Sequence, residues 1–205
     1  MNLLLIDNHD SFTWNLVELF QTRCKCTVNI VRSEYASECD VSKYRGVIFS
    51  PGPGLPDEHP GMNYILDKVE ELFFKNRIVL PVLGVCLGMQ AIAIHYSGRL
   101  YNLDKVVHGQ SCKLYFPGEN HFLFKGIQEG TRAGLYHSWA VDPRFLPGSL
   151  EVTAVSEDNV IMALQHKTLP VCGIQFHPES VMTMEGYTMM MNWLFTEYFS
   201  NTKKR

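Results

Sequence analysis

The chain has 205 residues, of which 46% are hydrophobic and 19% are charged, and its formal net charge is −3. This composition is typical of one globular domain and argues against a largely disordered chain. The near-neutral balance, with a pI of about 6.2, argues against nucleic acid as the main partner. The longest apolar run, residues 78–89, contains a proline and two glycines and is too short to cross a bilayer.

Features of the whole chain also predict its compartment and its domain organisation. The N-terminus has no basic segment before its apolar run, so it does not resemble a signal peptide. Six cysteines without a secretion signal indicate reduced thiols, and we expect a cytoplasmic protein. We expect one domain over residues 1–200 and a frayed tail at 201–205.

The first half of the chain alternates apolar runs with helical periodicity. Residues 1–6 predict a buried strand, and Asp10 or Ser11 can cap the helix that follows. Further strands are expected at 27–31, 46–49 and 78–83, and further helices over 62–73 and 90–96. Repeated strand–helix alternation predicts a parallel sheet that is covered on both faces.

The pattern changes after residue 98. Five segments joined by short turns favour antiparallel additions to one edge or side of the sheet: 105–116, 131–137, 150–155, 160–166 and 171–176. A final helix is expected over 185–199. The predicted fold class is therefore α/β: a doubly wound, mostly parallel central sheet with helices on both faces and antiparallel additions.

The strongest local signal is GVCLG at 84–88, between a predicted strand and a predicted helix. This is the strand–elbow–helix arrangement of a G-x-S-x-G nucleophile, with Cys86 in the serine position. Glycines on both sides permit a tight turn, and a helix N-terminus favours the thiolate. A buried structural cysteine is the alternative, but this context favours a nucleophile.

A cysteine nucleophile needs a base, and His177 is the best placed of eight histidines. It follows the predicted strand 171–176, and the carboxyl ends of parallel strands line a shared crevice. Glu179, two residues later, can orient the imidazole as the third member of a triad.

The segment SPGPGLP at 50–56 follows the third predicted strand. Its purely structural interpretation is a rigid loop. Its functional interpretation is a preorganised loop whose backbone N–H, from Gly52 or Gly54, faces a developing oxyanion.

Taken together, SPGPG, GVCLGMQ and GIQFHPES resemble the class I (triad) glutamine amidotransferases, which have a flavodoxin-like fold. The opening LLIDNHDSFTWNL and the later YHSW resemble the glutaminase subunits of anthranilate synthase and aminodeoxychorismate synthase. The resemblance runs from residue 2 to about 195. It implies that Cys86 is the nucleophile, that His177 is the general base and acid, and that Glu179 orients it.

The resemblance also implies a set of glutamine contacts. Main-chain groups of the loop and the elbow would hold the substrate or its oxyanion, Gln90 would contact the substrate, and two residues of YHSW would hold its α-amino and carboxylate end. These residues are Gly52, Pro53, Gly54, Leu87, Gln90, Ser138 and Trp139. Met89 stands where the family usually has histidine, and Trp139 stands where it usually has an aliphatic residue; an inward-facing indole could narrow the pocket.

The implied reaction is hydrolysis of L-glutamine through a Cys86 thioester, with no cofactor or metal in this subunit. The implied partner is a chorismate-binding synthase subunit that consumes the ammonia. Residues 8–12 are a candidate docking patch, with a helix cap as the alternative. Residues 108–111 are a second candidate docking patch, with a strand bend as the alternative.

Two other functions remain open: a stand-alone hydrolase of γ-glutamyl or peptide substrates, and a catalytically silent binding subunit.

Overall fold

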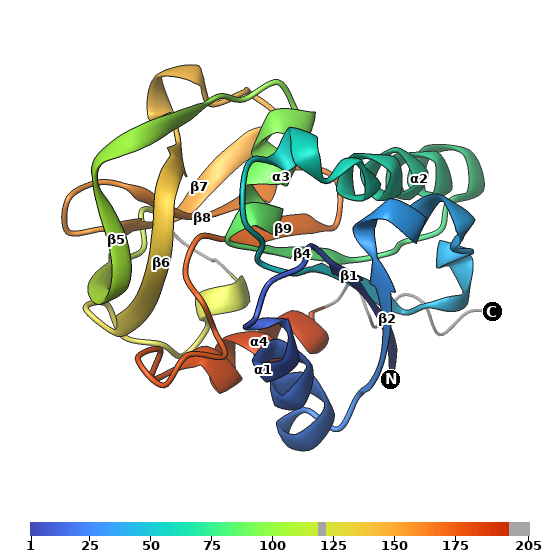
Figure 1. Ribbon diagram of the computed structural model, residues 1–205, viewed down its shortest axis with the longest axis horizontal. Helices are drawn as coiled ribbons and strands as arrows, with labels where there is room; N and C mark the ends of the chain where they lie inside the picture. The colour runs from blue at the N-terminus through green and yellow to red at the C-terminus, as the bar shows by residue number, and fades with distance from the viewer. Residues whose placement is uncertain (119–121, 197–205) are drawn as a thin grey trace.

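A computed structural model describes residues 1–118 and 122–196. Its centre is a nine-stranded sheet with the strand order β2-β1-β3-β4-β9-β8-β7-β5-β6 (Figure 1). The strands are β1 Asn2–Asp7, β2 Thr27–Arg32, β3 Gly46–Phe49, β4 Val82–Val85, β5 Leu100–Tyr115, β6 Arg132–Val141, β7 Leu150–Ser156, β8 Ile161–His166 and β9 Val171–Ile174. The helices are α1 Thr13–Glu18, α2 Pro60–Asn76, α3 Leu87–His95 and α4 Gly186–Leu194. The prediction of a doubly wound α/β fold is confirmed.

Five strands form the parallel part of the sheet. The ladders β2–β1, β1–β3, β3–β4 and β4–β9 are all parallel. All four residues of β3, β4 and β9 are buried, as expected for strands covered on both faces. The order 2-1-3-4 is that of flavodoxin-like sheets, whose ligands bind outside the carboxyl ends of the strands.

The remaining strands continue the sheet in antiparallel fashion, from β8 through β7 and β5 to β6. The ladder between β5 and β6 shifts register between His108 and Gln110, where Gly109 has a φ of +66°. This is the geometry of a β-bulge. The strand bend expected as one interpretation of residues 108–111 is therefore present.

Two apolar cores lie on opposite faces of the sheet, and β1 contributes alternate residues to each. Leu3 and Leu5 join the core beneath α1 and α4, whereas Leu4 and Ile6 join the core beneath α2 and α3 (Figure 1). In the ranges that the structure covers, no helix combines the length and the apolar character needed to cross a membrane.

Several predicted boundaries were wrong. The strand expected at 78–83 begins only at Val82, because Pro81 has no N–H to donate to a ladder. The helix expected over 90–96 begins earlier, at Leu87. Strand β9, expected among the antiparallel additions, pairs in parallel with β4 and lies inside the sheet.

The first and last predicted helices also differ from expectation. Helix α1 starts after Phe12, with no side-chain cap at that residue; Asp10 instead accepts the Phe12 N–H at 2.6 Å one turn earlier. Helix α4 ends at Leu194. The expected helical residues 197–199 and the expected tail at 201–205 lie outside the described residues.

The elbow glycines allow α3 to pack against β3 and β4. A Cβ on Gly88 would lie 2.7 Å from Phe49 Cβ and 2.8 Å from the Phe49 carbonyl oxygen, and one on Gly84 would lie 2.4 Å from the Gly88 carbonyl carbon. Contacts this short with backbone cannot be relieved by a side-chain rotation. The glycines are therefore required by close approach.

We expect Gly88→Ala to lower the free energy of unfolding by about 1–3 kcal/mol, as overpacking of a core does. Helix propensity alone would favour alanine in α3 by up to about 1 kcal/mol, so a net loss isolates the steric effect. Urea unfolding measures it. Gly148→Ala is the control, because a Cβ there meets nothing within 4 Å; equal stability of the two variants would contradict the argument.

Candidate active site

The backbone of Cys86 turns sharply between β4 and α3. Its φ of +53° and ψ of −104° are rarely adopted by a residue with a side chain. The Cys86 N–H donates to the Ile174 carbonyl of β9 at 2.7 Å, and the Cys86 carbonyl accepts the Gln90 N–H at 3.1 Å. These bonds hold the nucleophile elbow that the motif predicted.

His177 follows β9, the strand next to β4, so the fold brings it to Cys86. The His177 N–H donates to the Gly134 carbonyl at 3.0 Å. The Thr183 hydroxyl donates to the His177 carbonyl at 2.5 Å and accepts the Gly134 N–H at 2.9 Å. The backbone that carries the imidazole is therefore tied to β6 on both sides.

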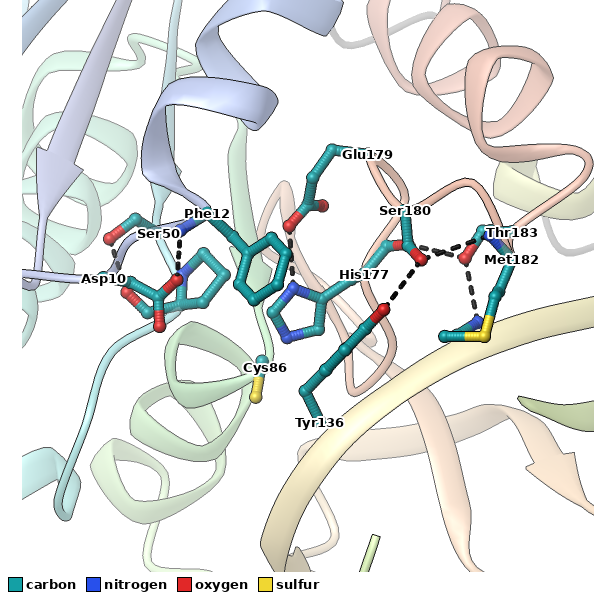
Figure 2. Close-up of polar contacts among 12 residues, drawn as sticks. Asp10, Phe12, Ser50, Cys86, Tyr136, His177, Glu179, Ser180, Met182 and Thr183 are labelled. Carbon is teal, nitrogen blue, oxygen red and sulfur yellow. Dashed lines mark hydrogen bonds and ion pairs between the residues drawn. The ribbon is translucent and has the colours of Figure 1, made fainter. Parts of the chain in front are cut away.

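The imidazole of His177 and the carboxylate of Glu179 form a buried pair. Their Nδ1 and Oε1 atoms are 2.7 Å apart, and the two side chains are only 2% and 1% exposed. The second ring nitrogen, Nε2, has no hydrogen-bond partner among the described residues. Figure 2 shows this nitrogen on the side of the ring nearer to Cys86, opposite the carboxylate.

Two opposing effects act on the pKa of His177. Burial lowers it, but interactions with Cys86 and Glu179 outweigh burial and raise the pKa from 6.5 to about 10. The imidazolium is thus the stable form at neutral pH. A cation beside a thiol is the environment in which a cysteine becomes a nucleophile.

Aromatic rings enclose the imidazole. Phe12 and Tyr136 meet it edge-on, with ring centroids 5.5 Å and 4.9 Å away (Figure 2). Phe12 comes from the predicted docking patch at 8–12, so this residue forms a wall of the site. Asn8 of the same patch is fully buried and bonds Ser50, which leaves His9 and Ser11 as its exposed residues.

The glycine-rich loop and the elbow meet as the motifs predicted. A Cβ on Gly52 would lie 2.6 Å from Leu87 Cδ2, so the backbone of Gly52 packs closely against the Leu87 side chain. Gly54, with a φ of +74°, instead packs over Glu58. Pro53 is exposed, and its carbonyl lies 2.9 Å from His59 Nε2. Gly52 is therefore better placed than Gly54 to face the thiol.

The predicted substrate residues on α3 and β6 are also adjacent. Gln90 Nε2 donates to the Trp139 carbonyl at 2.9 Å. Ser138 and Trp139 are both half-buried on β6. Met89, on the other face of α3, is fully buried against Gly173 of β9, so it belongs to the core and not to the site.

Three residues near the triad escaped prediction. Gln175 and His137 are buried within the motifs GIQFHPES and YHSW, and Thr183 ties down the His177 backbone. Burial lowers the pKa of His137; the bond from its Nδ1 to the Trp139 carbonyl opposes this, and the nearby His177 adds to it. His137 is therefore neutral.

No group of three or more metal-ligating side chains occurs in the described ranges. All six cysteines lie within those ranges and are free thiols. The pKa of Cys112 and that of Cys172 are raised to about 12, chiefly by burial. These two thiols are unreactive core residues.

A thiol on a strained elbow beside a histidine–carboxylate pair, at the carboxyl ends of parallel strands, is an arrangement that can perform cysteine-dependent acyl transfer. The sequence comparisons identify the family. Residues 4–196 match the model of the glutamine amidotransferase class-I family. The chain belongs to this family, and its resemblance to the class I glutamine amidotransferases is confirmed.

Individual relatives support the same assignment. The chain is 37% identical to aminodeoxychorismate synthase component 2 of Escherichia coli, over 94% of this chain and 98% of that one. It is 36% identical to anthranilate synthase component 2 of Azospirillum brasilense, over 95% of each. The fold matches a solved glutamine amidotransferase of Thermotoga maritima with a TM-score of 0.71, at 20% identity, over 100% of this chain and 85% of that one.

The raised pKa of His177 makes stability depend on pH. A pKa of about 10 in the folded state, against 6.5 when exposed, gives stabilisation that is complete below pH 6.5 and is lost as the pH rises to about 10. We expect Glu179→Gln to weaken this dependence, because it removes the anion that favours the imidazolium. Thermal unfolding between pH 6 and pH 11 measures the difference.

Glu185→Gln is the matched control, because Glu185 bonds Thr188 at the start of α4 and not the triad. Its pH dependence should follow that of the unmodified chain. Identical pH slopes for Glu179→Gln and the unmodified chain would contradict the ion pair.

Proposed function

We propose that this chain is a glutaminase subunit that hydrolyses L-glutamine and delivers ammonia to a chorismate-utilising synthase subunit. The observation that carries the activity is the buried Cys86–His177–Glu179 constellation on the nucleophile elbow. The family assignment supports glutamine as the substrate. The names of the relatives, which are components of anthranilate and aminodeoxychorismate synthases, support the partner.

The proposed reaction has two halves. The Cys86 thiolate attacks the side-chain carbonyl of glutamine, and the N–H groups of Leu87 and Gly52 stabilise the oxyanion. His177 donates its Nε2 proton to the departing nitrogen, which leaves as ammonia, and a γ-glutamyl thioester remains on Cys86. His177 then accepts a proton from water, the hydroxide attacks the thioester, and glutamate and the thiolate are released.

Glu179 holds one tautomer of the imidazole throughout. Its Oε1 accepts the Nδ1–H, so Nε2 is the nitrogen that exchanges protons with substrate and water. The reaction as written uses only side chains and backbone of this chain, and we expect it to need no cofactor or metal. A cytoplasmic location also stays a prediction.

The two alternative functions are less well supported. A stand-alone hydrolase would have the same triad, but the relatives are components of synthases. A silent binding subunit would need an incomplete site, whereas Cys86, His177 and Glu179 lie together. Met89, one of the two departures from the family pattern, is a core residue.

The test is ammonia release from glutamine by the purified chain, alone and with an anthranilate-forming or an aminodeoxychorismate-forming synthase subunit plus chorismate. We expect release that a partner stimulates. Cys86→Ala should reduce it by at least about 10³-fold, as loss of a nucleophile does in other triads. Stimulation by one partner assigns the pathway, and stimulation by both indicates a shared subunit.

Substrate breadth separates the remaining outcomes. Partner-independent hydrolysis of γ-glutamyl peptides would instead support a stand-alone hydrolase. No release from a folded chain under any pairing would overturn the glutaminase proposal.

A further inference from the structure

Within the described structure, Gln175 is the only polar side chain with a directed hydrogen bond to the Cys86 sulfur. Its Nε2 donates to Cys86 Sγ at 3.5 Å, a normal length for a hydrogen bond to sulfur. Gln175 lies between β9 and His177 and is fully buried. Its backbone N–H donates to the Met162 carbonyl of β8 at 2.8 Å, so the residue is fixed on the strand next to the elbow.

The other end of the Gln175 amide is also bonded. Its Oε1 accepts from Gln90 Nε2 at 3.1 Å, and the same nitrogen donates to the Trp139 carbonyl at 2.9 Å. The Trp139 carbonyl also lies 2.9 Å from His137 Nδ1. A continuous buried chain of polar contacts therefore runs from the thiol, through two amides, to the YHSW segment of β6.

The bonding pattern fixes the orientation of both amides. Gln90 uses both hydrogens of Nε2 as donors, which leaves only its Oε1 to bind a ligand. Gln175 must present its NH₂ to the sulfur because its oxygen is taken by Gln90. The Trp139 carbonyl accepts two bonds already, so it is saturated before any substrate arrives.

Burying a side-chain amide costs free energy of folding unless its N–H and C=O groups form hydrogen bonds. Apart from His177, the surroundings of Cys86 include an apolar core with Leu135, Ile174 and Phe176. Leucine or methionine would fill the volume of Gln175 at lower cost. The amide does one thing that they cannot: it offers an N–H to the sulfur, and such a bond is strengthened when the acceptor is charged and buried.

The catalytic imidazole makes no equivalent bond. Although Cys86 is close enough to affect the titration of His177, no directed hydrogen bond joins His177 Nε2 to the sulfur within the described structure. In Figure 2 the sulfur is directed away from the ring. In this orientation the sulfur accepts a hydrogen bond from Gln175.

We propose that Gln175 is a positioning residue for the nucleophile, which orients Cys86 Sγ and stabilises its thiolate, and that Gln90 locks the Gln175 amide in the required orientation. The pair links the glutamine pocket on α3 and β6 to the reactive sulfur. The kinetic part of this inference rests on the proposed glutaminase function, whereas the effect on the thiol itself does not.

The thiol is tested directly by alkylation with iodoacetamide as a function of pH, following the Cys86 peptide by mass spectrometry so that the other cysteines do not contribute. We expect Gln175→Leu to lower the alkylation rate near neutral pH by about 10-fold or more, the size of a hydrogen bond to a charged group. The pH midpoint of alkylation should move upward. Gln175→Glu should move it further, because a carboxylate would then face the thiolate.

Steady-state kinetics separate positioning from substrate binding. We expect Gln175→Leu to lower kcat for ammonia release by about 10-fold to 100-fold, with KM changed by less than about 3-fold. Gln175→Met, which keeps the length of the side chain, should behave like Gln175→Leu and replaces it if that variant does not fold. Gln165→Leu is the control: this glutamine on β8 bonds Glu151 and lies outside the polar chain.

A double-mutant cycle tests whether the two amides act as a unit. If Gln90 acts on the thiol through Gln175, Gln90→Leu with Gln175→Leu should be no slower in alkylation than Gln175→Leu alone. Effects that multiply would overturn the lock. A folded Gln175→Leu or Gln175→Met with the alkylation profile and kcat of the unmodified chain would overturn the positioning role.

The two proposals fail separately. Alkylation needs neither glutamine nor a synthase, so a Gln175-dependent thiol in a chain that releases no ammonia would leave this inference standing and overturn the proposed function.

Discussion

The active site depends on one strained backbone position. Cys86 adopts a φ of +53°, which costs free energy for any residue other than glycine. The cost is offset by hydrogen bonds to Ile174 and Gln90 and by the contact of α3 with β3 that Gly88 permits. If the elbow relaxed to an ordinary φ, the thiol would no longer be held at the carboxyl end of β4, and the histidine–glutamate pair would have nothing to activate.

The order of the strands explains how distant segments form one site. Strand β9 is the last strand in sequence, yet it lies next to β4 in the middle of the sheet. Cys86 therefore ends one strand, and Gln175 and His177 follow its immediate neighbour. The same insertion places Gly134 of β6 against His177. Cys86, His177 and Glu179 therefore come together only when β9 is in place beside β4.

The sequence predicted those elements whose burial follows a periodic pattern along the chain, and those where a motif requires a particular backbone conformation. Buried parallel strands are short apolar runs, so β1 and β3 could be predicted, and the glycines around Cys86 predicted the elbow. The start of β4 was missed because Pro81 interrupts a ladder inside an apolar run. The parallel pairing of β9 with β4 was not predicted. The order of strands in the sheet decides this pairing, and that order leaves no local pattern in the sequence. Gln175, His137 and Thr183 escaped for a similar reason, since their partners lie on other strands or in distant loops.

Electrostatics explain why the site contains two histidines with opposite behaviour. His177 and His137 are both buried, and burial alone lowers the pKa of each. Of these two histidines, only His177 has a carboxylate on its Nδ1, so the positive charge of the pair resides there and balances Glu179 or the thiolate. A second imidazolium close by would oppose the first. Burial and the nearby His177 lower the pKa of His137, and they outweigh the bond from its Nδ1–H to the Trp139 carbonyl, which raises it. That bond also anchors the carbonyl to which Gln90 is tied. The neutral histidine thus supports the same chain of amides that reaches the sulfur, so the charge distribution and the orientation of the nucleophile are two consequences of one buried polar network.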